Sequence, residues 1–179
     1  VADGNILWSV NLVADTGTSD AAYLNFDPTD VAVTTLDDDT VSVLVTQLGG
    51  STLVAEGGAT DSYTMVLTSQ PTASVTITVA PDAQLSVSPS SLTFTTVNWF
   101  TTQAVTVTAV DDQITESAHT GTINHTASGG GYGGLSVASV TAAIIDNDPA
   151  GVVVSALSSG VVEGGATATY TLALSTIPT

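Results

Sequence analysis

One segment of the chain occurs twice, and this repetition limits the fold more than any other feature. Residues 56–72 read EGGATDSYTMVLTSQPT, and residues 163–179 read EGGATATYTLALSTIPT, a spacing of 107 residues. Residues 31–39 and 140–148 form a second matching pair, spaced by 109 residues, and both copies end in acidic residues. A period of this length corresponds to one small β-sandwich. The sequence therefore predicts β-sandwich repeats arranged in tandem.

The chain contains one complete repeat unit between two partial ones. Residues 41–148 form one complete unit, residues 1–40 match the C-terminal part of a preceding unit, and residues 149–179 match the N-terminal part of a following unit. A counterpart of residues 73–109 occurs in neither flank. We expect each flank to leave apolar strand faces uncovered and to be unstable alone in water.

The complete unit alternates apolar and polar residues, which is typical of short strands with one buried face. Gly and Pro turn signals separate these segments, and none is patterned as an amphipathic helix. The predicted class is all-β, an antiparallel Ig-like β-sandwich in which Tyr63, Met65 and Leu67 point inward. Seven strands are expected, at residues 41–45, 63–67, 75–79, 85–87, 105–109, 120–126 and 140–144.

The charged residues are acidic, because the chain has 17 acidic residues and no Lys or Arg. Such a chain has no cationic side chain to neutralise nucleic-acid phosphates or anionic lipid headgroups, so its natural partners are cations. The acids fall in groups, for example at residues 37–39, 111–112 and 146–148, which indicates sites rather than a solvating surface. Without Cys or Lys, disulfides and Lys–Asn cross-links are excluded as stabilising bonds. No apolar run approaches the roughly 18 residues of a membrane helix.

Three short motifs carry a resemblance to a known family. They are Val-Ala-Glu-Gly-Gly at residues 54–58, Val-Asp-Asp-Gln-Ile-Thr-Glu at residues 110–116, and Ile-Ile-Asp-Asn-Asp at residues 144–148. Together they resemble the Calx-beta domains of sodium/calcium exchangers, integrin β4 and bacterial surface proteins. The resemblance covers residues 41–148 fully and both flanks in part.

The resemblance implies a calcium site at one end of the sandwich. His119 stands where a further acidic ligand is expected and Asn147 interrupts the last acidic run, which implies fewer or weaker ions. The flanking acids are expected to belong to further sites, with Asp3 matching Asp112. The implied Ca²⁺ ligands are Glu56, Asp82, Asp111, Asp112, Glu116, Asp146 and Asp148 in the complete unit, and Asp37, Asp38, Asp39 and Glu163 in the flanks.

Elementary chemistry agrees with calcium, which takes 6 to 8 oxygen ligands from carboxylates, carbonyls and water. The alternative is a set of turn-forming Asp residues on a solvated surface. His119 and His125 lie on one expected strand and are more typical of a surface pair than of a zinc site. Trp8, Trp99 and Phe100 offer rings for sugar stacking, but scattered aromatics usually anchor loops or fill a core.

The chain is not expected to be an enzyme. It contains no Gly-x-Ser-x-Gly motif, no Lys to act as a base and no nucleophile placed beside a His. Its carboxylates are adjacent rather than separated as a general acid and a base.

The predicted function is a calcium-stabilised structural or adhesive repeat of an extracellular, cell-surface protein or fibre. One alternative is a carbohydrate-binding module of a surface adhesin or secreted enzyme, with a glycan ligand held by Trp99, Phe100 and residues 129–134. Another is a calcium sensor, which requires micromolar affinity. The expected partners are neighbouring repeats of a longer chain, or subunits joined head to tail into a filament with calcium shared across the junction.

Overall fold

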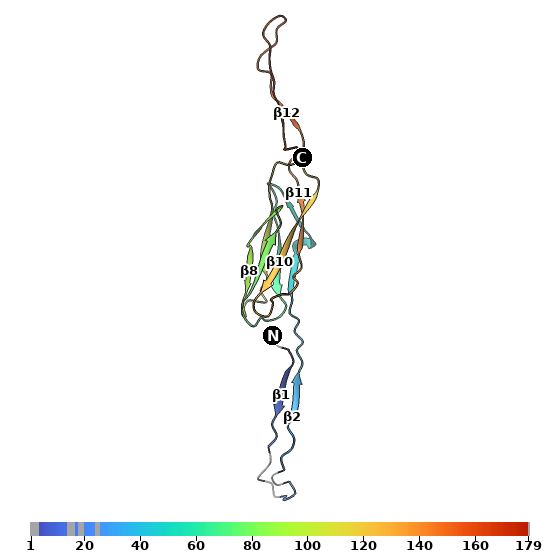
Figure 1. Cartoon of the computed structure of the whole chain (residues 1–179), viewed down its shortest axis with the longest axis vertical. Coiled ribbons are helices and arrows are strands. Elements are labelled where there is room, and N and C mark those ends of the chain that lie inside the picture. The colour runs from blue at the N-terminus through green and yellow to red at the C-terminus, as the bar shows by residue number, and fades with distance from the viewer. Residues whose placement is uncertain (1–3, 14–16, 18–19, 24–25, 179) are drawn as a thin grey trace.

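The computed structural model describes residues 4–13, 17, 20–23 and 26–178. It has three parts along its longest axis: a hairpin, a β-sandwich and a second hairpin (Figure 1). The N-terminal hairpin pairs β1 (Ile6–Val10) with β2 (Val31–Thr35), and the C-terminal hairpin pairs β12 (Val152–Val154) with β13 (Leu172–Leu174). The two hairpins project from opposite ends of the sandwich.

Two sheets form the sandwich. The four-stranded sheet has the order β3-β5-β9-β7, and the five-stranded sheet has the order β4-β11-β10-β6-β8. The bounds in the first sheet are β3 Val43–Gln47, β5 Asp61–Leu67, β9 Gln103–Ala109 and β7 Leu85–Ser88. Those in the second are β4 Thr52–Ala55, β11 Val140–Ile145, β10 His119–Ser128, β6 Val75–Pro81 and β8 Ser91–Phe94.

The predicted all-β sandwich is confirmed, but the expected strand count and pairing were wrong. Within residues 41–148, all of which the structure describes, nine strands form where the alternation predicted seven. The two additional strands are β4 and β8, of four residues each. The sandwich is not purely antiparallel, because β4 runs parallel to β11. A 3₁₀ turn, η1 (Leu48–Gly50), lets the chain leave β3 in one sheet and enter β4 in the other.

The core lies between these two sheets. Tyr63, Met65 and Leu67 alternate inward on β5 as predicted and are almost completely buried. From the five-stranded sheet, Ile77 on β6 and Ile123 on β10 are fully buried as well. This one continuous cluster of apolar side chains explains why the central unit folds around its own core.

The structure corrects the expectation for His125. The sequence predicts a surface residue, but its side chain is buried, with Nε2 on the hydroxyl of Tyr63 and Nδ1 on the carbonyl oxygen of Ala138. It occupies the inward position that follows Gly121 and Ile123 along β10. His125 is therefore a hydrogen-bonded core residue.

The aromatic pair expected to stack on sugars or to anchor a loop lies between β8 and β9. Trp99 is partly buried against the core, and its ring meets that of Phe100 edge-on, with centroids 5.7 Å apart. Only Phe100 of the two is largely exposed. Trp99 therefore serves as a loop anchor here.

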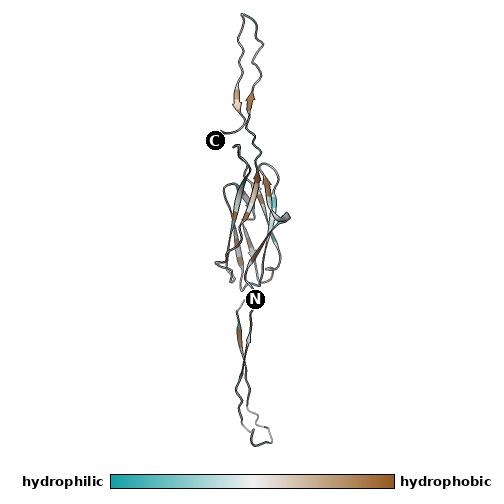
Figure 2. Ribbon diagram, turned by 90° about the vertical axis from the view of Figure 1, so that its right-hand side faces the viewer, coloured by the Kyte–Doolittle hydropathy of each residue, from teal (hydrophilic) through white to brown (hydrophobic). Residues whose placement is uncertain are grey.

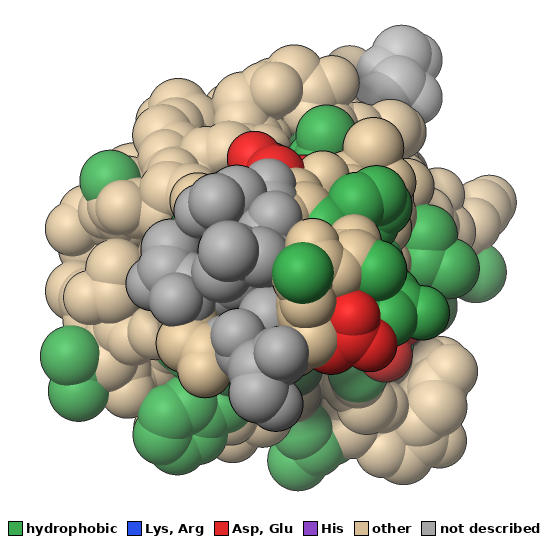
Figure 3. All heavy atoms as spheres, turned by 90° about the horizontal axis from the view of Figure 1, so that it is seen from below, with side chains coloured by type: hydrophobic (Ala, Val, Ile, Leu, Met, Phe, Trp, Pro, Cys, Tyr) green, Lys and Arg blue, Asp and Glu red, His purple; other side chains and the backbone are tan. Residues whose placement is uncertain are grey.

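The two hairpins lack a core of their own. Their strands carry brown, hydrophobic segments in Figure 2, and all of their residues are exposed. Seen from the N-terminal hairpin end, the molecule shows hydrophobic and acidic side chains and no Lys or Arg (Figure 3). In the described residues there is no helix long and apolar enough to cross a membrane.

Candidate cation site at one end of the sandwich

Four strand ends bring the acidic motifs together at the end of the sandwich next to the C-terminal hairpin. Glu56 directly follows β4 and Asp146 directly follows β11. Because these two strands are parallel and paired, their C-terminal ends meet at one edge of the sheet. Residues 111–116 follow β9 and lead into β10, which begins at His119.

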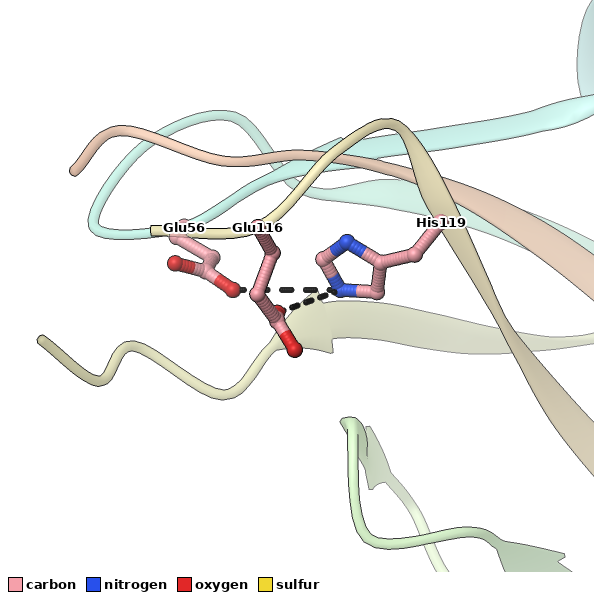
Figure 4. A group of neighbouring side chains, drawn as sticks. All are labelled: Glu56, Glu116 and His119. Carbon is pink, nitrogen blue, oxygen red and sulfur yellow. Dashed lines mark ion pairs between the residues drawn. The ribbon is translucent and has the colours of Figure 1, made fainter. Parts of the chain in front are cut away.

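Glu56 is the centre of this cluster. Its side chain is 1% exposed, and its backbone N–H donates to the carbonyl oxygen of Ile145, which continues the β4–β11 ladder. Ligand atoms of Glu56, Asp112 and Asp148 all lie within 4.8 Å of one another. A second group within the same limit joins Glu56 to Glu116 and His119 (Figure 4). Glu56 therefore belongs to both groups.

Several polar atoms in this cluster are buried without a hydrogen-bond partner in the described part of the chain. They are Oε2 of Glu56, Oε2 of Glu116, Nε2 of His119 and Oδ2 of Asp148. Buried polar atoms in native proteins are almost always satisfied by protein, water or an ion. These atoms are therefore open to a water molecule, a proton or a cation.

The electrostatics of the cluster also favour a cation. Burial, followed by the nearby charges of Asp112, Asp146 and Glu116, raises the pKa of the Glu56 carboxyl above its ordinary value. Burial and neighbouring carboxylates raise the pKa of Asp148 as well. Ionised together, these groups repel one another. A bound cation would remove that penalty.

Asp146 has a supporting role. Its Oδ2 accepts from the backbone N–H of Glu116 at 2.8 Å, and its Oδ1 accepts from that of Asp148 at 2.9 Å. These two hydrogen bonds, led by the one from Asp148, lower the pKa of Asp146. Asp146 therefore remains ionised while it fixes the loops that carry Glu116 and Asp148.

Asn147 joins the motifs, although the sequence alone had marked it as an interruption. Its Nδ2 donates to the backbone oxygen of Glu56 and to Oδ1 of Asp111, both at 3.0 Å. A Cβ on Gly57 would lie 2.8 Å from that Nδ2, and Gly57 has a φ of +56°. The Glu-Gly-Gly motif thus leaves space for Asn147.

His119 is held with one ring nitrogen toward the carboxylates. Its Nδ1 lies 3.1 Å from the carbonyl oxygen of Ser117, and its Nε2 lies 3.2 Å from Glu116 and 4.0 Å from Glu56 (Figure 4). Because a carbonyl only accepts, Nδ1 carries a hydrogen and Nε2 faces the carboxylates. A proton or a metal ion on Nε2 makes that contact attractive.

The remaining residues of the predicted site lie outside these two groups. Oδ2 of Asp82 accepts from the N–H of Thr122, and its Oδ1 accepts from Gln84. Asp37 accepts from Gly4 and Asp39 at the end of β2, and Glu163 is exposed in the C-terminal hairpin. Asp38, which lies between Asp37 and Asp39 in the sequence, lines the same shallow hollow as those two residues. Asp3 lies outside the described residues.

The donor set suits calcium. Glu56, Asp112 and Asp148 offer carboxylate oxygens from three loops, and calcium is an oxygen-preferring ion. His119 adds a nitrogen, which calcium does not favour. The oxygen group of Glu56, Asp112 and Asp148 is therefore the better calcium candidate.

Comparisons with known proteins gave structural similarity alone. No known protein family matches the chain, and no curated protein sequence matches it. The apo form of the Calx CBD1 domain is 17% identical over 60% of this chain and 99% of its own, with a TM-score of 0.42. Domains 4 and 5 of the S-layer protein SbsC are 17% identical over 79% of this chain and 76% of theirs, with a TM-score of 0.37. The E. coli chaperone DraB is 9% identical over 60% of this chain and 56% of its own, with a TM-score of 0.41. These similarities do not place the chain in a family.

Proposed function

We propose that this chain is a calcium-stabilised, non-catalytic structural repeat of an extracellular surface protein or fibre. The buried carboxylate of Glu56 carries the proposal. It lies among acidic side chains, its Oε2 has no hydrogen-bond partner among the described residues, and the chain has no Lys or Arg to compensate it. An ionised group in such a place is strongly unfavourable without a counter-ion.

An extracellular location is consistent with a calcium site of modest affinity. Extracellular calcium modules bind with Kd values of roughly 10⁻⁴ to 10⁻³ M, which suffices where calcium is millimolar. The three motifs that resemble Calx-beta domains are the ones that meet here, at the strand ends. A structural role is supported by the elongated arrangement of hairpin, sandwich and hairpin (Figure 1).

The experiment is calorimetric unfolding of the intact chain in excess chelator and in millimolar calcium. An ion that binds only the folded protein adds RT ln(1 + [L]/Kd), about 1.4 kcal/mol per site at tenfold saturation. We expect calcium to raise the melting temperature, and magnesium at the same concentration to raise it less because magnesium demands stricter geometry.

The matched variant is Asp112→Asn combined with Asp148→Asn, which keeps the side-chain shapes and removes two charges. This double variant should lose most of the rise in melting temperature that calcium gives to the wild type. Identical melting curves of the wild-type chain in calcium and in chelator would refute the proposal.

A further inference from the structure

The two hairpins repeat strand pairs of the sandwich. Val31 on β2 is the counterpart of Val140 on β11, and it faces Val10 just as Val140 faces Ile123 on β10. The N-terminal hairpin is therefore paired like β10–β11.

The C-terminal hairpin repeats β3–β5 in the same way. Val152 faces Leu174, as Val43 faces Leu67. This hairpin therefore supplies the counterparts of two strands from the four-stranded sheet, whereas the N-terminal hairpin supplies counterparts from the five-stranded sheet.

Local hydrogen bonds recur with the strands. The N–H of Ser175 donates to the carbonyl of Gly151 at 3.0 Å, as that of Thr68 donates to Ser42 at 3.0 Å. In the other flank the N–H of Asp39 donates to Oδ1 of Asp37, as that of Asp148 donates to Asp146.

The sandwich shows what covers the counterparts of each hairpin. Its β3–β5 pair and its β10–β11 pair belong to the two sheets that enclose the core, and Tyr63 on β5 touches His125 on β10. In one molecule the two hairpins lie at opposite ends (Figure 1), so neither can cover the other. We infer that the N-terminal hairpin of one copy packs against the C-terminal hairpin of a second copy. This inference rests on the proposed structural role and names its partner.

The area available is sufficient. At most of the positions that face inward in the sandwich, both hairpins carry large apolar residues, with exposed fractions from 37% for Ile6 to 62% for Leu172. Covering them would bury on the order of 1,000 Å², the lower range of specific interfaces. They are Ile6, Trp8, Val10, Val31 and Val33 on one hairpin and Val152, Val154, Tyr170, Leu172 and Leu174 on the other.

The side chain of Trp8 would fill a gap that such a junction would otherwise contain. Trp8 faces Val33, and the corresponding pair in the sandwich is Gly121 and Ala142. A Cβ on Gly121 would lie 2.5 Å from Cγ of Leu85, so Leu85 of β7 fills the space over this glycine. Neither hairpin contains a counterpart of β7, so in a junction of these two hairpins the indole of Trp8 would occupy that space.

A third pairing would join the two copies through the backbone. In the sandwich, Ile144 on β11 lies beside Val54 on the parallel strand β4. Their counterparts are Thr35 on β2 and Val161, whose side chain is 68% exposed. Residues 159–162 of one copy would thus extend the edge of β2 in the next copy, a form of strand addition. Because the two contacting surfaces differ, the contact repeats head to tail and produces an open filament.

Cysteine cross-linking tests this junction, because the chain has no native Cys. Thr35→Cys and Val161→Cys proteins are prepared separately, mixed in calcium and oxidised mildly. Neighbouring strands place Cα atoms within the range that a disulfide requires. The control mixes Thr35→Cys with Ala173→Cys, since Ala173 is the counterpart of Val66, which faces away from the core on β5. We expect the first mixture to form dimers about tenfold faster than the control.

Adding Trp8→Ala to the Thr35→Cys protein should slow this cross-linking about tenfold, as loss of a central aromatic anchor does at interfaces. Thermal unfolding of the sandwich should stay unchanged, because Trp8 lies outside it. Equal rates in the Val161→Cys and Ala173→Cys mixtures would overturn the junction, as would cross-linking insensitive to Trp8→Ala. The calcium-dependent melting temperature reports on the sandwich alone, so failure there is distinguishable from failure of the junction.

Discussion

Tyr63 and His125 are hydrogen-bonded to each other across the interior of the sandwich, from opposite sheets. Oη of Tyr63 lies 2.7 Å from Nε2 of His125, and Nδ1 of His125 lies 2.7 Å from the carbonyl oxygen of Ala138. Because that carbonyl only accepts, Nδ1 carries the hydrogen and Nε2 accepts from the tyrosine hydroxyl. Burial raises the pKa of Tyr63, which keeps the phenol protonated as a donor.

Replacing Tyr63 by Phe should destabilise the sandwich by about 1–3 kcal/mol, because Nε2 of His125 then loses its donor while it stays buried. Urea denaturation measures this change. The double variant Tyr63→Phe with His125→Leu removes both polar groups and should recover part of the loss. A Tyr63→Phe protein as stable as the wild type would contradict the assigned hydrogen bond.

The same pair predicts a loss of stability at acid pH. Burial lowers the pKa of His125, only partly offset by its hydrogen bond to Ala138, so the unfolded chain takes up this proton more readily than the folded one. The stability that the neutral, buried His125 contributes is present above the pKa of this residue in the unfolded chain, near 6.5. It is lost as pH falls through the lower pKa of His125 in the folded chain. Denaturation midpoints at decreasing pH, in saturating calcium, should fall more in the wild type than in the double variant. Parallel curves for the two proteins would contradict this prediction.

Glu56→Gln should stabilise the chelated protein by on the order of 1 kcal/mol, because it removes a buried charge among carboxylates. Since the folded pKa of Glu56 is raised, the chelated wild type should lose stability as pH rises above about 4.5, and the variant should lose less. The variant should also gain less from calcium. Asp27→Asn removes an exposed charge outside the sandwich and serves as the control. A chelated Glu56→Gln protein less stable than the chelated wild type would be inconsistent with the cation site.

His119→Asp should bind calcium about tenfold more tightly than the wild type, since it places an oxygen ligand where a ring nitrogen faces Glu56 and Glu116. Isothermal titration calorimetry gives the affinity. His119→Asn removes the ring without adding a charge and is the matched control. Equal affinities for the Asp and Asn variants would mean that His119 does not border the bound ion.

Gly121→Ala should cost about 1–3 kcal/mol through overpacking, because the added Cβ would lie 2.5 Å from Cγ of Leu85. Gly133→Ala is the control, since nothing lies within 4 Å of a Cβ there. Chemical denaturation compares the two variants. Combining Gly121→Ala with Leu85→Ala should relieve the clash, so the double variant should show a less-than-additive loss.

Much of the fold could be predicted because period-two alternation marks strands that bury one face. The strand at residues 63–67 was found in this way, with the three inward residues in their observed positions. β4 and β8 were missed because four residues are too few to show a period beside turn signals at 49–50 and 89–90. The parallel pairing of β4 with β11 joins strands far apart in sequence, and no local pattern encodes it.

The candidate site could be predicted in outline because its acids end strands that share one edge. The structure changed the interpretation of two residues. Asn147 appeared to weaken the acidic run, yet its amide joins Glu56 to Asp111. His125 was expected at the surface, although its position two residues after Ile123 already placed it on the inward row.

The path of the chain through the sandwich determines how the molecule would respond to a pulling force. The chain enters the sandwich at β3, from the N-terminal hairpin end, and leaves it after β11 at the other end (Figure 1). A pull along the long axis therefore acts parallel to the strands, and β11 cannot slide unless its ladders to β4 and β10 fail together. An ion bound by Glu56 and Asp148 would clamp the end of β11 at its exit, so calcium would act as a mechanical lock as well as a thermodynamic ligand.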